Sequence, residues 1–318
     1  MPRVTIGLPV FNGARHLPAA LDALLAQSFA DFELIIADNA STDATGEICR
    51  AYAARDQRIH YLRAARNMGA AANFNRIVPL AAGEYFKWAA HDDLCRPTFL
   101  EACIAALEAD RGLVLATSRS LIIDDAGRPL GTYNFELQAD GDDPVQRFAQ
   151  TLRGHKCYEI FGVIRTEVLR QTNLIGNYAH GDGVLLADLA LRGRFCELPE
   201  PLFMPRSHRQ QSMNMVLDYH AYTWWFDPAK SGKLVFPCWR ILREYLRVVN
   251  RAPISAAQRV GCYRHLARWC VHWRRRLRGD LTAAVRFLLG RRPPPAAAHD
   301  PQREKSWNPA LEVAAREQ

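Results

Sequence analysis

A histidine and two adjacent carboxylates, His91, Asp92 and Asp93, are the residues of this chain best suited to chemistry. They follow an extended stretch at residues 84–88, so they stand where a strand is predicted to end. Neighbouring carboxylates at such a point suit a divalent cation, because hard cations take oxygen ligands and bridge to phosphate. The alternative is that Asp92 and Asp93 only cap a helix that begins near Pro97.

The elements before and after this group alternate between strands and helices. Apolar periodicity predicts strands at residues 4–10, 32–37, 59–62, 84–88 and 113–117, and helices at 17–25, 41–55, after 69, and at 97–109. Ser41 or Thr42 is predicted to cap the second helix. This order is typical of βαβ units and a parallel sheet, which bind ligands at the carboxyl ends of the strands.

Four polar loops should therefore meet at one edge of the sheet. They are Phe11-Asn12, Asp38-Asn39, Arg66-Asn67 and His91-Asp92-Asp93. Further along, residues 124–127 predict a hairpin turn, residues 144–152 and 184–191 predict helices, and residues 161–165 and 195–198 predict strands.

Two common ways of binding a nucleotide are absent. The loop after the first strand holds one glycine, Gly13, whereas a dinucleotide fold needs G-x-G-x-x-G for backbone amides to approach the pyrophosphate. A G-x-x-x-x-G-K-[ST] phosphate loop is missing as well. A pyrophosphate would need another source of positive charge, and a metal held near Asp92 and Asp93 can supply it.

Several segments, taken in order, resemble the landmarks of glycosyltransferase family 2. They are residues 4–13 (VTIGLPVFNG), 38–43 (DNASTD), 66–69 (RNMG), 91–93 (HDD) and 181–183 (GDG). The resemblance covers roughly residues 3–215. It implies a GT-A fold, that is, a mixed, mostly parallel sheet flanked by helices. It also implies a nucleotide-diphosphate sugar donor, a divalent metal (Mn²⁺ or Mg²⁺) and inversion at the anomeric carbon.

The resemblance assigns roles position by position. It implies that Pro9 and Phe11 line the base pocket, that Asp38 contacts the base, and that Arg66 and Asn67 flank the nucleotide. Asn12, Asn39, His91 and Asp92 complete the expected donor site. The family's D-x-D metal motif is imperfect here, because its first acid is replaced by Ala90 or His91. Both Asp92 and Asp93 therefore stay candidates for the metal.

Asp182 is the candidate catalytic base. Inverting transfer needs a carboxylate to take the proton of the acceptor hydroxyl. Asp182 stands between two glycines at a helix start, where the backbone should leave room for an acceptor. The alternative is a helix cap that stabilises by about 1 kcal/mol. Asp188, further along the same helix, is interpreted as a surface or structural acid.

His208 resembles a late metal or diphosphate contact that closes over the donor, and the alternative is an exposed loop histidine. The chain lacks the Q-x-x-R-W motif and the membrane spans of processive family members. Transfer of one sugar, or a few, per encounter is expected.

The composition of the chain predicts the cellular compartment in which it works. The chain has 318 residues, 49% of them hydrophobic, and a net charge of +8. Its eight cysteines form no C-x-x-C pair, which favours reduced thiols and argues against a zinc site. Neither a signal peptide nor a membrane-spanning apolar run is evident. A cytoplasmic protein, or one peripheral on the cytoplasmic membrane face, is expected.

The positive charge gathers between residues 240 and 292, where arginines interleave with Trp, Leu and Val. Such helices suit an anionic leaflet, or they pack on the catalytic domain with their arginines in water. No nucleic-acid reader motif occurs. The expected division is a catalytic domain at 1–218, a basic helical extension at 219–290 and a disordered tail at 291–318.

The predicted function is sugar transfer to a saccharide or lipid-linked acceptor, as in building an envelope polysaccharide. The alternative is a catalytically silent module on the same scaffold that binds a nucleotide-sugar or a membrane.

Overall fold

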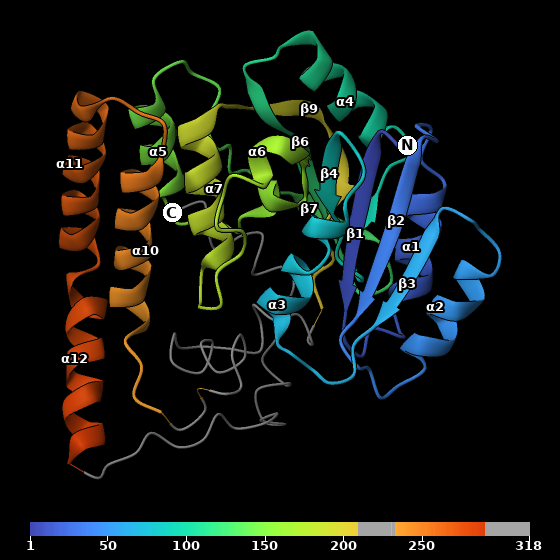
Figure 1. Ribbon diagram of the computed structural model, residues 1–318, viewed down its shortest axis with the longest axis horizontal. Helices are drawn as coiled ribbons and strands as arrows, with labels where there is room; N and C mark the ends of the chain where they lie inside the picture. The colour runs from blue at the N-terminus through green and yellow to red at the C-terminus, as the bar shows by residue number, and fades with distance from the viewer. Residues whose placement is uncertain (209–229, 231–232, 290–318) are drawn as a thin grey trace.

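The computed structural model describes residues 1–208, 230 and 233–289 (Figure 1). In this part of the chain one nine-stranded sheet runs in the order β3-β2-β1-β4-β8-β6-β9-β5, with β7 paired to β6. The strands are β1 Val4–Val10, β2 Phe32–Asp38, β3 Ile59–Arg63, β4 Tyr85–Trp88, β5 Leu94–Cys95, β6 Leu113–Ile123, β7 Pro129–Thr132, β8 Val163–Arg165 and β9 Arg194–Met204. The predicted mixed sheet is confirmed.

Helices cover both faces of the sheet. They are α1 Leu17–Leu25, α2 Thr45–Ala53, α3 Ala70–Asn75, α4 Phe99–Ala109, α5 Pro144–Thr151, α6 Thr166–Leu169, α7 Gly181–Arg192, α10 Pro237–Arg251, α11 Ala256–His272 and α12 Arg274–Leu288, with short 3₁₀ turns η1 Val78–Leu80 and η2 Tyr158–Phe161. One core packs β1 against α1, α2 and α4, and a second packs the opposite sheet face against α3 and α7.

Strand β2 shows why these strands are apolar on both faces. Leu34 and Ile36 enter the first core, whereas Ile35 and Ala37 enter the second. A strand buried between two helical layers has no solvent side, so its sequence reads as a continuous apolar run. The neighbours β3, β2, β1 and β4 are all parallel, and their carboxyl ends therefore share one edge.

One capping prediction is wrong, and one alternative is excluded. Helix α2 begins after Ala44, and Asp43 accepts a hydrogen bond from Thr45 N, while Ser41 and Thr42 face the first loop instead. Asp92 and Asp93 do not cap α4, because its N-cap is Thr98 and strand β5 intervenes.

The C-terminal helices form a third core with the rest of the protein. Ile241 and Tyr245 of α10 are fully buried against Val184 and Leu191 of α7. Helices α11 and α12 flank α10 on the side away from the sheet (Figure 1). The predicted boundary at 218 and the tail at 291–318 lie outside the described residues.

Packing of α10 on α7 predicts the effect of one cavity mutation. Ile241→Ala should lower the free energy of unfolding by about 2–5 kcal/mol, because it removes a fully buried side chain. Leu246→Ala is the matched control, since Leu246 on the same helix is 37% exposed. Chemical denaturation followed by circular dichroism measures both. Equal, small effects would contradict the packing.

Candidate active site at the carboxyl edge of the sheet

The four predicted loops do converge. Val10 pairs with Asp38, and Asp38 pairs with Arg63, so the ends of β1, β2 and β3 lie side by side. Gly7 pairs with Trp88 on the other side of β1, which brings the loop after β4 to the same edge. Parallel register thus gathers the predicted donor-site residues of these loops.

Asp38 anchors this edge. Its carboxylate is fully buried and accepts hydrogen bonds from Tyr61 Oη and Arg63 Nη1, both at 2.7 Å. It accepts a third hydrogen bond from Ser41 N at 2.8 Å. Burial opposes its ionisation, but the bonds from Ser41 and Tyr61 and the charge of Arg63 together hold its pKa below the usual value. Asp38 is therefore a preformed negative group with oriented partners, and its contact with a base stays a prediction.

Asn39 fixes the turn that carries Arg66 and Asn67. Its Nδ2 donates to Asn67 Oδ1 at 2.9 Å, and its Oδ1 accepts from Met68 N at 2.9 Å. Gly69 follows at φ 85°, a backbone conformation that glycine adopts without steric cost. The Arg66 side chain is exposed, and no ion pair holds it within the described residues, so it is available to a ligand.

The loop after β1 is similarly tied. Asn12 has a positive φ of 51°, and its Oδ1 accepts from Thr42 N at 2.8 Å. Pro9 is buried in β1, whereas Phe11 is 43% exposed, as a side chain that stacks on a ligand would be. A Cβ on Gly13 would lie 2.5 Å from His91 Cδ2, so only glycine lets the His91 loop approach this closely.

Asp92 pairs with His208. Their Oδ2 and Nε2 atoms are 2.8 Å apart; the His208 side chain is buried and the Asp92 side chain is partly buried. Burial opposes ionisation of Asp92, but the positive charges of His91 and His208 and the hydrogen bond from His208 hold its pKa at about 2. His208 is thus no exposed loop histidine, since only 6% of the residue is accessible.

Asp93 has a different environment. Its Oδ1 accepts a hydrogen bond from Arg206 N at 2.8 Å. Burial, together with the negative charge of Asp92, raises its pKa well above the usual value, although Lys87 and Arg206 oppose the rise. Of the two carboxyl groups, Asp92 therefore ionises at the lower pH.

Arg206 is the residue that sequence reasoning missed. It is 3% exposed, its Nε donates to Asp92 O at 2.7 Å, and its Nη1 donates to Asp124 O and Asp125 O at 3.1 and 3.0 Å. A buried guanidinium needs such acceptors, and here they join the loop after β4 to the β6–β7 turn. The sequence signal that could have identified Arg206 is its position two residues before the candidate ligand His208.

His16 is a second unforeseen member. Its ring centroid lies 5.0 Å from that of His208, and its Nε2 lies 3.1 Å from Asp125 Oδ1. Burial first, and then the charges of Arg206 and His208, lower its pKa to about 4. His16 is therefore neutral near pH 7.

Asp182 lies in a separate cluster. It stands in the first turn of α7, where its Oδ1 accepts from Gly183 N at 2.8 Å, and it does not occupy the N-cap position, which is His180. Ligand atoms of Cys157, His180 and Asp182 all lie within 4.8 Å of one another. His180 Nε2 and Tyr245 Oη of α10 are 3.0 Å apart.

The flanking glycines of Asp182 serve packing. A Cβ on Gly181 would lie 2.3 Å from Gly176 O, and one on Gly183 would lie 2.2 Å from His180 Cε1. The expectation that they leave room for an acceptor is wrong, because neighbouring atoms fill that space. Asp188 is a structural acid, 3% exposed and paired with Arg192 at 2.8 Å.

The donor set at the sheet edge fits a divalent cation through two residues. Asp92 Oδ2 and His208 Nε2, which lie 2.8 Å apart, would hold the cation once it replaces the proton between them. Asp93 fits less well, because Arg206 N already occupies its Oδ1. Such cations often use one or two protein ligands and take the rest from phosphate and water.

The mixed sheet, with helices on both faces and polar loops over its parallel carboxyl ends, is of the GT-A class. The sequence model described as Glycosyl transferase family 2 matches residues 5–172. The chain belongs to this family. The match covers the β1 to β4 loops but stops before Asp182 and His208.

Curated relatives agree over shorter stretches. The chain is 34% identical to the putative glycosyltransferase EpsE of Bacillus subtilis over 127 residues, which are 40% of this chain and 46% of EpsE. It is 31% identical to glycosyltransferase GlyG of Streptococcus pneumoniae over 98 residues, 31% of this chain and 33% of GlyG. The matched region therefore spans less than half of either relative.

Solved structures show the same fold at low identity. S. aureus TarS 1–349, in complex with UDP-GlcNAc, superposes with a TM-score of 0.65 and 16% identity, covering 85% of this chain and 73% of that one. The mannosyltransferase PcManGT of Pyrobaculum calidifontis, in complex with GDP-Man and Mn²⁺, superposes with a TM-score of 0.55 and 16% identity. The superposition covers 99% of this chain and 79% of PcManGT.

Proposed function

We propose that this chain transfers a sugar from a nucleotide-diphosphate sugar to an acceptor hydroxyl, with inversion at the anomeric carbon. The observation that carries the proposal is the set of preformed polar loops over β1 to β4, with the Asp92–His208 pair among them, in a family 2 chain. TarS with UDP-GlcNAc and PcManGT with GDP-Man, which share the fold, support a nucleoside-diphosphate donor.

The donor's nucleoside would lie over β1 and β2. Phe11 offers an exposed aromatic face for the base, and the hydrogen-bonded carboxylate of Asp38 ends the neighbouring strand β2. Arg66, on the turn that Asn39 and Asn67 hold, offers an exposed positive charge to the nucleotide. Asp92 and His208 would hold the metal, which would supply Lewis-acid stabilisation of the departing diphosphate.

Asp182 would take the proton of the acceptor hydroxyl. Two features support this role. The carboxylate lies in the first turn of α7, at the positive end of the helix dipole, and ligand atoms of Cys157 and His180 lie within 4.8 Å of its own. Both neighbours have positive φ, 54° and 67°, and strained backbone of this kind often accompanies functional sites.

Replacement of Asp182 tests the base. Asp182→Asn should lower turnover by about 10²–10⁴-fold, the usual contribution of general base catalysis, while donor affinity changes little. Release of nucleoside diphosphate from UDP-GlcNAc and GDP-mannose, with Mn²⁺ or Mg²⁺, measures turnover, and calorimetry measures binding. Asp142→Asn, an exposed acid near α5, is the matched control. Unchanged turnover in Asp182→Asn would contradict the assignment of Asp182 as the base.

No turnover of any donor by the native chain would favour the alternative function, a catalytically silent module that binds a nucleotide-sugar or a membrane.

The two acids should separate experimentally. Asp92→Asn should weaken Mn²⁺-dependent nucleotide binding by roughly tenfold or more, because it removes a charged ligand that pairs with His208. Asp93→Asn keeps an oxygen acceptor for Arg206 N and should retain most of the binding. Titration of UDP with and without Mn²⁺ compares the variants. The reverse ranking would assign the metal to Asp93.

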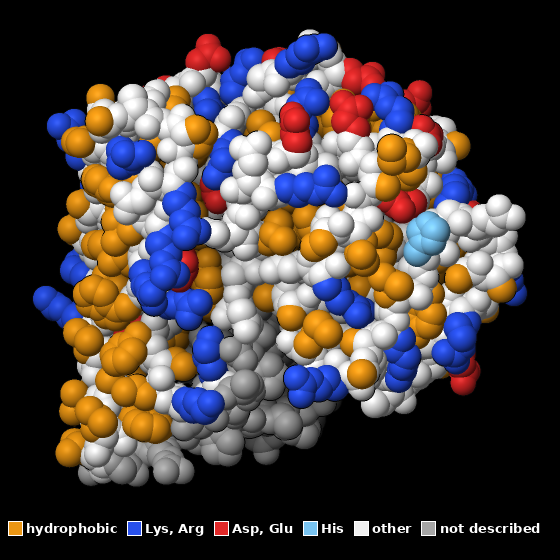
Figure 2. All heavy atoms as spheres, in the orientation of Figure 1, with side chains coloured by type: hydrophobic (Ala, Val, Ile, Leu, Met, Phe, Trp, Pro, Cys, Tyr) orange, Lys and Arg blue, Asp and Glu red, His pale blue; other side chains and the backbone are white. Residues whose placement is uncertain are grey.

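The acceptor is proposed to be a saccharide or a lipid-linked glycan at an anionic membrane surface. None of the helices in the described residues is long and apolar enough to cross a membrane. Helix α12 instead exposes Leu281, Val285 and Leu288, at 48%, 55% and 76%, on one stripe. Arginines lie among hydrophobic side chains over the C-terminal helices (Figure 2), a pattern typical of interfacial helices.

Membrane attachment can be tested by substitutions on the exposed face of α12, which leave the third core intact. Replacing Leu281, Val285 and Leu288 together with Gln should weaken binding to anionic liposomes at least tenfold, because each buried apolar side chain contributes roughly 1.5–3 kcal/mol. Leu80→Gln, 52% exposed near β4, is the control. Sedimentation at low and high salt measures binding. Equal sedimentation of both variants would exclude α12 as the attachment surface.

A further inference from the structure

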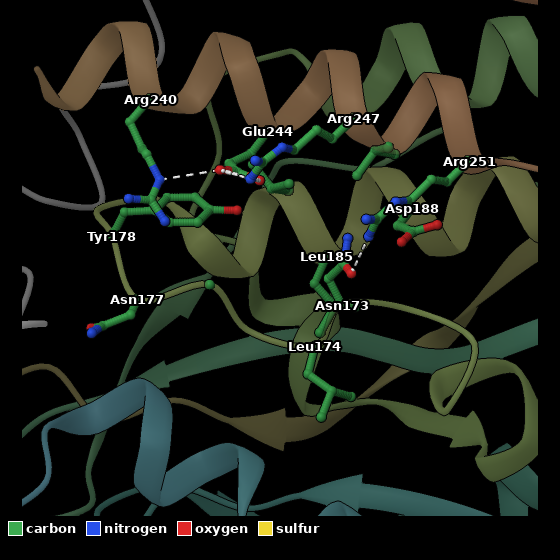
Figure 3. Close-up of a pocket in the computed structure, with 13 residues that line it drawn as sticks. Asn173, Leu174, Asn177, Tyr178, Leu185, Asp188, Arg240, Glu244, Arg247 and Arg251 are labelled. Atoms are coloured by element: carbon green, nitrogen blue, oxygen red, sulfur yellow. Dashed lines mark hydrogen bonds and ion pairs between the residues drawn. The ribbon is translucent and has the colours of Figure 1, made fainter.

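A cavity lined by α7 and α10 lies away from the sheet edge. It occupies about 250 Å³ between α7 and α10 and is closed on one side by the segment 173–178 (Figure 3). Drug-sized ligands occupy roughly 300–1,000 Å³, so this cavity suits a smaller group.

Three arginines of α10 line this cavity. Arg240, Arg247 and Arg251 share it with one carboxylate of the same helix, Glu244. Arg240 Nε lies 3.1 Å from Glu244 Oε1, and Arg247 Nη1 lies 2.9 Å from it. The remaining lining acid, Asp188, is already paired with Arg192. Arg240 and Arg247 therefore share the single charge of Glu244, and Arg251 adds a third positive charge to the same cavity.

The guanidinium groups keep unused donors. Each carries five N–H bonds, of which Glu244 engages only Arg240 Nε and Arg247 Nη1. Arg251 Nη1 donates to Asn173 Oδ1 at 2.7 Å. Their other N–H groups have no protein acceptor among the described residues. Arg240 and Arg247 side chains remain 39% and 44% exposed, so a solute can reach them.

Tyr178 completes the wall. Arg240 Cζ lies 5.2 Å from the centre of its ring, and the Tyr178 hydroxyl points into the cavity (Figure 3). The ring packs directly over Gly176, where an added Cβ would lie 2.0 Å from Tyr178 Cε1. The hydroxyl is thus held in place as an additional donor.

We propose that this cavity is a binding site for a phosphate group, carried either by a soluble phosphate ester or by a lipid headgroup. Phosphate offers several acceptor oxygens to forked guanidinium donors, and arginine is suited to such bidentate contacts. The site is distinct from the donor site at the sheet edge, and its ligand binding does not depend on catalysis.

The test measures phosphate binding to the full chain. Calorimetry with inorganic phosphate and with glycerol 3-phosphate should show binding that Arg247→Gln weakens about tenfold, since a hydrogen bond to a charged group is lost. Glu244→Gln should tighten binding several-fold, because it removes the competing carboxylate. Arg243→Gln, an exposed arginine of α10 outside the cavity, is the control and should not change it.

Vesicles distinguish the source of the phosphate. Flotation with phosphatidylcholine vesicles, with and without phosphatidic acid, is compared for the same variants. Binding that depends on Arg247 only with phosphatidic acid assigns a lipid headgroup, and dependence in the soluble titrations assigns a free ester. Equal behaviour of Arg247→Gln and Arg243→Gln in every assay overturns the proposal. Glu244→Gln keeps the test decisive if Arg247→Gln does not fold.

Discussion

The buried guanidinium of Arg206 is the constraint on which the candidate site depends. A charge removed from water must be met by acceptors, and those available are the backbone oxygens of Asp92, Asp124 and Asp125. Its own backbone N–H meanwhile occupies Asp93. Satisfying one side chain thus fixes the loop after β4, the β6–β7 turn and the segment that carries His208. The Asp92–His208 pair forms because these three segments are held together.

Sequence patterns predicted what depends on periodicity and on parallel topology. The apolar run of β2 indicated burial on both faces, and strand order then placed Asp38 and the Asn39 turn at one edge with the loops after β1 and β4. Those conclusions need no side-chain detail, because parallel strands end on the same side of a sheet. The sequence alone therefore predicted the fold class and the four loops that meet at the sheet edge.

Long-range side-chain contacts were not accessible. Choosing between Asp92 and Asp93 requires knowing that Arg206, more than a hundred residues later, occupies one of them. The capping of α2 failed for a similar reason, because Ser41 Oγ accepts from Asn12 N instead. The glycines beside Asp182 looked like open space, yet Gly176 O and the His180 ring fill it. A single sequence carries no record of which distant atoms approach.

Helix α10 links the basic C-terminal region to the candidate base. Its apolar face, with Ile241 and Tyr245, is buried on α7, so the helix cannot leave without exposing the third core. Tyr245 also contacts His180, two residues before Asp182, while Glu244 and the arginines beside it face the cavity. A ligand that shifts α10 would therefore act on the first turn of α7 through packed side chains. Helices α10 and α11 are thus part of the third core together with α7, whatever surface their outer faces meet.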